Sequence, residues 1–198
     1  MILTAKSIDQ ALTAVIRDLE RVGLLTERLY SVEVYRHVID VRGCFGLYVE
    51  DCGFLESILG FKPRSIYIPQ VSWARVRESL QRMGRGRTSL RDVLRHEYGH
   101  AFAVEHPNLV RKSKSFQVVF GAAYDDQVPP CPYDPNVHVS PYAATAPYED
   151  FAETFMLYVK YGGKIDRFKK RPIVYKKMQF IQKLALKLKQ KQQAQEAA

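Results

Sequence analysis

The stretch His96-Glu97-Tyr98-Gly99-His100 is an H-E-x-x-H motif. Residues four apart lie on one face of a helix, so in a helical segment His96 and His100 would point two imidazoles at the same metal ion. Neutral imidazole is a good ligand for Zn²⁺. Glu97 would project beside the two histidines, where its carboxylate can take a proton from an attacking water instead of binding the metal. The motif therefore predicts a zinc-dependent hydrolytic site.

The residues around the motif predict a helix over residues 90–105. Ser89 followed by Asp92 is a helix start signal, apolar residues recur at intervals of three or four, and Pro107 favours an end just before it. Gly99 costs roughly 1 kcal/mol of helix propensity relative to alanine, which indicates that another segment packs closely against the helix there. The two histidines are thus expected on one face of a helix.

A second helix is expected to begin at Pro147 and to end at the glycine pair Gly162-Gly163. It carries Glu149 and Glu153, which are four residues apart. One of these carboxylates can bind the metal ion while the other supports a ligand histidine through its second ring nitrogen. This helix is therefore the candidate source of the third ligand.

The residue pattern alone leaves the third ligand open. His138, Asp150 and Glu153 are alternatives to Glu149. His106 is expected at the surface, because it does not have the spacing of the third histidine in metzincins.

Taken together, the two motifs resemble a known family. The pattern H-E-x-G-H followed by Y-x6-E-x-F-A-E-x-F is that of gluzincin metallopeptidases related to anthrax lethal factor and to the Pro-Pro endopeptidases. The resemblance covers roughly residues 66–155 and is specific at the two motifs. The residues that carry it are His96, Glu97, Gly99, His100, Tyr142, Glu149, Phe151, Ala152, Glu153 and Phe155.

This resemblance implies a zinc-dependent endopeptidase that hydrolyses peptide bonds in a protein or peptide substrate. A strand at residues 65–68 would correspond to the edge strand along which zincins lay an extended substrate. Each polar residue of the pattern receives a role: His96, His100 and Glu149 as ligands of one zinc ion, Glu97 as general base, Glu153 as the carboxylate that orients a ligand histidine, and Tyr142 as a donor to the oxyanion.

The remaining apolar periodicity predicts an α+β fold, a zincin-like domain in which a small mixed sheet packs on the H-E-x-x-H helix and a second helix brings the third ligand. Proline at position 69 confines its strand to a sheet edge or marks the end of that strand. The expected helices span residues 8–22 and 72–83, the latter with Trp73. The expected strands span residues 32–41, 45–49, 65–69 and 116–123, and a hairpin would pair the first two. A basic loop is expected at 84–87 and a proline-rich loop, which would border the substrate cleft, at 124–140.

Length and composition favour one globular domain over residues 1–198, divided into N-terminal helix and strands (1–64), catalytic core (65–162) and basic C-terminal helix and tail (163–198). Three cysteines, Cys44, Cys52 and Cys131, are an odd number without a C-x-x-C motif, which disfavours a disulfide framework. A Cys44–Cys52 bridge, or a second metal site that adds Cys131, remains a less favoured alternative. The absence of a signal-like N-terminus and of an 18-residue apolar run predicts a cytoplasmic location.

A formal net charge of +9 permits an acidic partner. Lysines cluster in the C-terminal segment with Phe180, Ile181, Leu184, Leu186 and Leu188. The favoured interpretation is an amphipathic helix whose apolar side packs on the domain. The alternative function is a non-proteolytic zinc module that binds nucleic acid, an anionic surface or an acidic protein through this helix.

Overall fold

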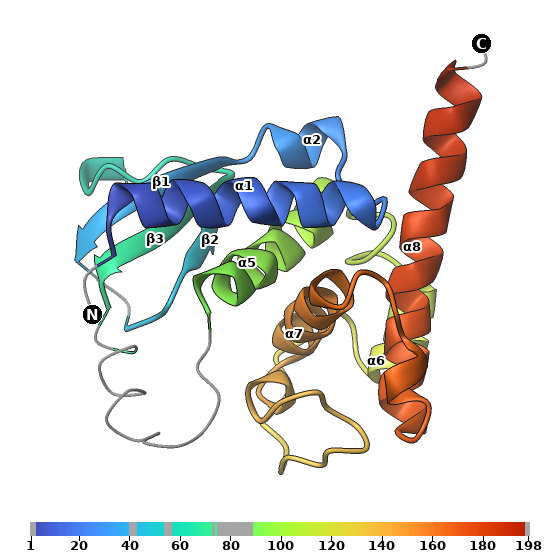
Figure 1. Ribbon diagram of the computed structural model, residues 1–198. Coiled ribbons are helices and arrows are strands. Elements are labelled where there is room, and N and C mark those ends of the chain that lie inside the picture. Colours follow the sequence, from blue (N-terminus) through green and yellow to red (C-terminus); the bar gives the residue numbers. More distant parts are fainter. Residues whose placement is uncertain (1–2, 40–42, 54–56, 73, 75–88, 197–198) are drawn as a thin grey trace.

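The computed structural model describes residues 3–39, 43–53, 57–72, 74 and 89–196. It contains a small three-stranded sheet and a larger set of helices (Figure 1), which confirms the predicted α+β class. The expected helix over 72–83, apart from residues 72 and 74, and the basic loop over 84–87 lie outside the described residues. In chain order the elements are α1 (Ala5–Arg21), α2 (Glu27–Tyr30), β1 (Glu33–Ile39), β2 (Leu47–Val49), β3 (Ser65–Val71), α5 (Leu90–Glu105), α6 (Lys114–Phe120), η1 (Tyr142–Ala144), α7 (Pro147–Lys160), η2 (Asp166–Phe168) and α8 (Pro172–Glu196).

The sheet has the strand order β1-β3-β2, with β1 parallel and β2 antiparallel to β3. The predicted hairpin between the first two strands is therefore wrong, because β3 inserts between them. The prediction that the proline-containing strand lies at an edge or ends there is also wrong, since β3 is central and continues past Pro69 to Val71. The described β2 pairs extend only from Ser65 to Tyr67, so Pro69 lies beyond them, opposite His37 of β1. Because the described β2 does not reach that point, the backbone N–H that Pro69 lacks leaves no β2 carbonyl without a donor.

The H-E-x-x-H helix α5 is the central element of the fold. It contacts β2 on one side, α1 and α2 on another, and α7 on the side that faces the second motif. Its first and last residues are those predicted. At its start, Ser89 and Asp92 form a complete capping box. At Gly99, helices α5 and α7 approach so closely that an added Cβ would lie 3.0 Å from the Cα of Ala152. The predicted close approach at this glycine is confirmed.

Two other elements differ from their predictions. Helix α1 begins three residues earlier than expected, because Thr4 caps it by accepting the N–H of Ser7. The strand predicted over 116–123 is instead helix α6. Ser113 caps this helix by accepting the N–H of Phe116, and Gly121 ends it in the left-handed conformation at φ 87°. These caps and the complete burial of Phe116 override the β-propensity of the segment.

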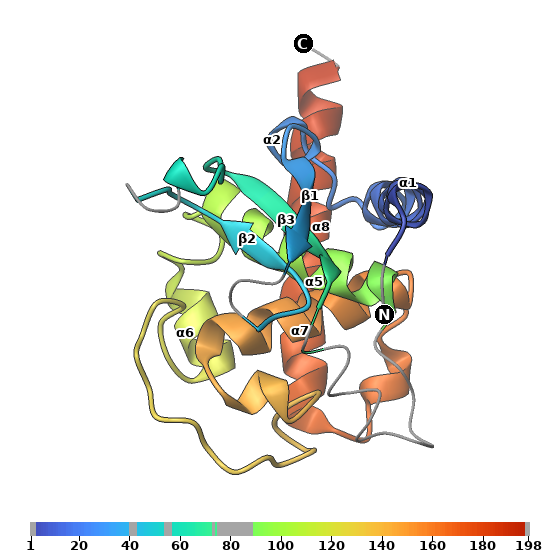
Figure 2. The same cartoon turned by 90° about the vertical axis from the view of Figure 1, so that its left-hand side faces the viewer.

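The C-terminal segment forms one helix, α8, that packs on α6 and α7. Its apolar side is buried, which supports the amphipathic interpretation, and its last turns project beyond the other elements (Figures 1 and 2). Among the described residues, no helix combines the length and the apolar character needed to cross a membrane. The buried apolar residues of α8 are Val174, Met178, Phe180, Ile181, Leu184, Ala185 and Leu188.

Candidate metal centre

Three side-chain atoms from the two motifs converge on one point. Oε2 of Glu149 lies 3.0 Å from Nε2 of His96 and 3.4 Å from Nε2 of His100, and the two nitrogens are 3.1 Å apart. A tetrahedral zinc ion with bonds of about 2.0–2.1 Å separates its ligand atoms by roughly 3.3–3.4 Å. Oε2 of Glu149 is also buried without a partner in hydrogen-bonding geometry. The three groups therefore fit a zinc ion in donor type and in spacing, and the ion would provide a partner for the buried oxygen.

Local sequence explains how these atoms meet. His96 and His100 occupy successive turns of α5, and Glu149 lies in the first turn of α7, two residues after Pro147 at the helix start. The missing side chain at Gly99 allows the two helices to touch between the ligand-bearing faces. The position of the candidate third ligand thus depends on a helix start and on a helix contact, which Pro147 and Gly99 indicate in the sequence.

Each candidate ligand histidine has a partner for its other ring nitrogen. Nδ1 of His96 lies 2.9 Å from Oε1 of Glu153, and Nδ1 of His100 lies 3.1 Å from the hydroxyl of Tyr124. Protons on the two Nδ1 atoms would leave both Nε2 lone pairs facing the candidate metal position. The Glu153 carboxylate is held in turn by the hydroxyl of Ser140, which donates to Oε2 at 2.6 Å. Tyr124 and Ser140 were missed in the sequence, where only their position at the two ends of the proline-rich loop distinguishes them.

Glu97 is buried beside the three groups. Its Oε2 accepts the backbone N–H of Tyr48 in β2 at 2.9 Å. Its Oε1 lies against Gly46, where an added Cβ would be 2.8 Å away. Burial raises the pKa of Glu97, and the neighbouring His96 and His100 only partly oppose this. A carboxylate with a raised pKa in a fixed position suits a group that takes and returns a proton.

Tyr142 lies at the solvent-facing side of the same cluster. Its hydroxyl donates to Oε1 of Glu149 at 2.8 Å, and its ring centroid is 5.7 Å from that of His96. The residue is 53% exposed, unlike the buried groups behind it. Burial of the hydroxyl end and the charge of Glu149 raise the pKa of Tyr142 above its usual value. The phenol therefore stays protonated and can act as a donor at neutral pH.

The charges in the cluster are arranged for a cation. Burial lowers the pKa of His96, but the carboxylates of Glu149 and Glu153 outweigh this and raise it to about 10. Burial raises the pKa of Glu149, but the imidazoles of His100 and His96 hold it well below its usual range. The cluster thus favours a bound proton on His96. A metal ion shared by the candidate ligand atoms could take the place of that positive charge.

The alternative third ligands have other contacts. Nε2 of His138 lies 3.8 Å from Oδ2 of Asp150 and 3.9 Å from Sγ of Cys131, whereas that Asp150 oxygen is 2.5 Å from Nζ of Lys177. His106 is half-buried rather than on the surface, with Nε2 3.0 Å from Oγ1 of Thr26. Within the described ranges, the group of three side chains that could hold a metal ion comprises His96, His100 and Glu149.

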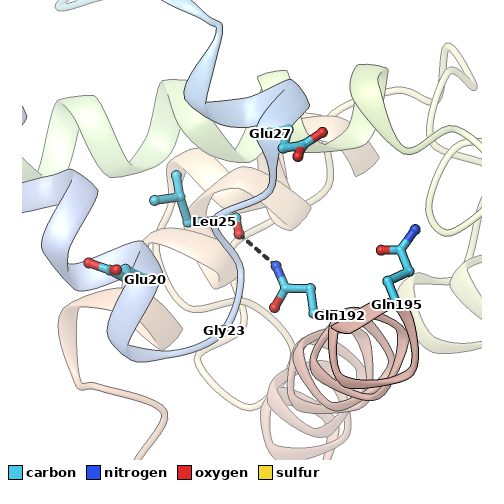
Figure 3. A pocket seen from close by; sticks show the side chains of 6 residues that line it. All are labelled: Glu20, Gly23, Leu25, Glu27, Gln192 and Gln195. Atoms are coloured by element: carbon cyan, nitrogen blue, oxygen red, sulfur yellow. Dashed lines mark hydrogen bonds between the residues drawn. The ribbon is translucent and has the colours of Figure 1, made fainter. Parts of the chain in front are cut away.

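The other features that the sequence raised lie away from this cluster. Cys44, Cys52 and Cys131 are not joined by disulfide bonds. A pocket occurs between the end of α1, the connection to α2 and the last turns of α8, where Gln192 donates to the carbonyl of Leu25 at 3.4 Å (Figure 3). None of its lining residues belongs to the cluster, so this pocket has no part in the chemistry of the site; they are Glu20, Gly23, Leu25, Glu27, Gln192 and Gln195.

Comparison with known proteins gives one match. The model of the family Peptidase_Mx, described as "Putative zinc-binding metallo-peptidase", matches residues 70–196. The matched region includes both helices that bring the three ligand atoms together. No curated protein and no solved structure matches the chain.

Proposed function

The chain belongs to this family of zinc-binding metallopeptidases, and from that premise we propose that it is an endopeptidase with His96, His100 and Glu149 as ligands of one zinc ion. The observation that carries the proposal is the set of distances of 3.0, 3.1 and 3.4 Å among the three ligand atoms, with Glu97 adjacent to them. Two histidines and one glutamate would make the site that of a gluzincin, as the resemblance to the lethal factor and Pro-Pro endopeptidase group implies.

When bound, zinc would supply a Lewis acid that activates water and polarises a peptide carbonyl. Glu97 would take the proton of the attacking water and pass it to the leaving nitrogen. The N–H of Tyr48 would hold one oxygen of Glu97 so that the other can face the reacting atoms. Tyr142 would release Glu149 and donate its hydroxyl hydrogen bond to the developing oxyanion.

The substrate would lie along β2 rather than along the strand that the sequence suggested. The described sheet places β3 in the centre, so residues 65–67 of that segment have strand neighbours on both sides. Strand β2 is antiparallel, lies at the edge, and contacts Glu97 through Tyr48. An extended peptide added to this edge would pass beside the general base, which is the geometry that strand addition requires.

The test combines zinc content by elemental analysis with cleavage of a peptide library. We expect one zinc per wild-type chain, internal cleavage of peptides, loss of zinc in Glu149→Ala, and loss of cleavage with zinc retained in Glu97→Gln. Absence of zinc from the wild type under metal-replete conditions would refute the proposal, and so would full cleavage by Glu97→Gln. Zinc retained in Glu149→Ala would mean that another residue is the third ligand.

The alternative of a binding module has less support. Lys177, one of the lysines of the basic helix, is 1% exposed and bonded to Asp150, so its charge is used inside the protein. Lys176, Lys183 and Lys187 remain exposed on the outer face of α8. If this face bound nucleic acid, replacing those three lysines with glutamine would weaken binding and reduce its dependence on salt.

A further inference from the structure

The proline-rich loop at residues 124–140 connects α6 with η1 and touches the candidate metal centre at both of its ends. At its start, the hydroxyl of Tyr124 lies 3.1 Å from Nδ1 of His100. At its end, Ser140 donates to Glu153 at 2.6 Å, and Glu153 lies 2.9 Å from Nδ1 of His96. Both candidate ligand imidazoles therefore contact this loop, that of His100 directly and that of His96 through Glu153.

Two cations from the C-terminal segment hold the loop. Arg171, directly before α8, donates from Nη2 to the carbonyl of His138 at 2.7 Å and from Nε to the carbonyl of Pro135. Lys177 in α8 donates from Nζ to the carbonyl of Val137 at 2.7 Å. Prolines at positions 129, 130, 132 and 135 lack the N–H groups with which a loop could satisfy its own carbonyls. The side chains of Arg171 and Lys177 donate hydrogen bonds to three of these carbonyls instead.

Lys177 also joins the loop to the helix that carries Glu149. Its Nζ lies 2.5 Å from Oδ2 of Asp150, the residue after Glu149, and 5.5 Å from the ring centroid of Phe120 in α6. Lys177 and Asp150 are 1% and 3% exposed. A buried ammonium ion needs both a carboxylate and further hydrogen-bond acceptors to offset its lost hydration, and here the acceptor is a loop carbonyl. The loop, α6, α7 and α8 thus meet at one side chain.

We propose that Arg171 and Lys177 are positioning residues for the metal centre. By fixing residues 135–138, they hold Ser140 where it keeps Glu153, and through it the imidazole of His96, directed at the metal ion. The inference rests on the proposed zinc ligands but not on the proposed peptidase reaction. It assigns the basic C-terminal helix a role inside the protein, as part of the support of the site.

The decisive variant is Arg171→Met. Arg171 is half-buried and its partners are loop carbonyls, so the variant leaves no buried carboxylate unpaired. Lys170→Met is the matched control, because it removes the same charge from the exposed neighbouring position. We would measure the zinc dissociation constant by competition with a chromophoric chelator, cleavage by chymotrypsin after the exposed loop residue Tyr133, and the Tm of the zinc-free protein.

We expect Arg171→Met to raise the zinc dissociation constant about tenfold or more, the effect of losing an outer partner of a metal ligand, and to accelerate cleavage after Tyr133. Lys170→Met should match the wild type in zinc affinity and in the rate of cleavage after Tyr133. Lys177→Met should act in the same direction if it folds, but Arg171→Met decides, because Lys177→Met also leaves Asp150 unpaired.

Zinc affinity in Arg171→Met equal to that of Lys170→Met would overturn the inference. A weaker affinity with unchanged cleavage after Tyr133 would also overturn it, because the effect would then not pass through the loop. If the wild type binds zinc but cleaves no peptide, the proposed function fails while this inference stands. If the wild type binds no zinc, the inference fails together with the metal site.

Discussion

Nδ1 of His96 lies 2.9 Å from Oε1 of Glu153, whose second oxygen accepts the hydroxyl of Ser140 at 2.6 Å. An ionised carboxylate can only accept hydrogen bonds, so Nδ1 of His96 carries a proton, and a bound metal ion would take the place of the proton on Nε2. Nε2 is the atom that lies near Glu149 and His100. Glu153 therefore sets the tautomer and the orientation of a ring that we expect to bind zinc.

Replacing Glu153 should weaken zinc binding without removing a ligand atom. We expect Glu153→Ala to raise the zinc dissociation constant by about 10- to 100-fold, because the imidazole of His96 loses its orienting acceptor. Glu153→Gln should lose less, since an amide oxygen can still accept the Nδ1 proton. Chelator competition measures both, with Glu149→Ala as the reference for loss of a direct ligand. A wild-type dissociation constant in Glu153→Ala would show that the carboxylate does not support the site.

A methyl group at position 46 should displace the proposed general base and leave the ligands alone. An added Cβ would lie 2.8 Å from Oε1 of Glu97 and 2.8 Å from Cγ1 of Val93. Both the Glu97 carboxylate and the buried side chain of Val93 must shift, so we also expect the variant to lower the free energy of unfolding. A misplacement of about 1 Å can lower kcat by up to roughly 100-fold, and we expect Gly46→Ala to lose about 10- to 100-fold with normal zinc content.

Gly60→Ala is the control for this prediction. Its Cβ would meet nothing within 4 Å, although the φ of 79° makes any side chain there strained. Gly60→Ala should therefore lower the free energy of unfolding while kcat stays at the wild-type value. Equal kcat in Gly46→Ala and the wild type would mean that Glu97 does not need its observed position.

Local signals predicted the two helices of the site because their ends depend on neighbouring residues. Ser89, Asp92 and Pro107 specify the observed bounds of α5, and Pro147 specifies the start of α7. Gly99 indicated a close contact but could not name Ala152 as its partner. Spacing within a helix thus predicts which side chains share a face, whereas the partner across the contact depends on the tertiary fold.

The errors and omissions involve contacts between distant segments. The predicted hairpin failed because β3, which begins 16 residues after β2 ends, pairs with both earlier strands. Tyr124 reaches His100 across 24 residues, and Ser140 reaches Glu153 across 13. A single tyrosine or serine in a loop has no repeating pattern that would mark such a partner. The sequence therefore identified the groups on helices and missed those that a loop brings to them.

Tyr142→Phe should slow catalysis with little effect on zinc binding. The hydroxyl donates to Glu149 at 2.8 Å, but Nε2 of both histidines and Oε2 of Glu149 remain in place without it. Loss of one oxyanion donor costs roughly 3–4 kcal/mol in other enzymes, so kcat should fall by about 100- to 1000-fold with KM nearly unchanged. Steady-state kinetics on a cleaved library peptide measure this. A rise in KM with unchanged kcat would instead assign Tyr142 to substrate binding, and unchanged kcat and KM would contradict the prediction.

His106 should make the fold less stable in mild acid. Burial lowers the pKa of His106, and the positive charge of Arg28 lowers it further. The unfolded chain, with a histidine pKa of about 6.5, then binds the proton before the folded protein does. The stability that neutral His106 contributes is fully present above about pH 6.5 and is lost as the pH falls through the lowered pKa of the folded state.

Urea unfolding of the wild type and of His106→Gln from about pH 7.5 to pH 5 tests this sign. The glutamine keeps a polar group near Oγ1 of Thr26, which lies 3.0 Å from Nε2 of His106, but it cannot take up a proton in this range. The free energy of unfolding should fall more steeply with acid in the wild type than in the variant. All other histidines are common to both proteins, including His138, whose pKa burial and Lys177 also lower, so the difference between the profiles belongs to His106. Parallel profiles over this range would contradict the prediction, because they would mean that His106 binds its proton equally well in the folded and unfolded chains.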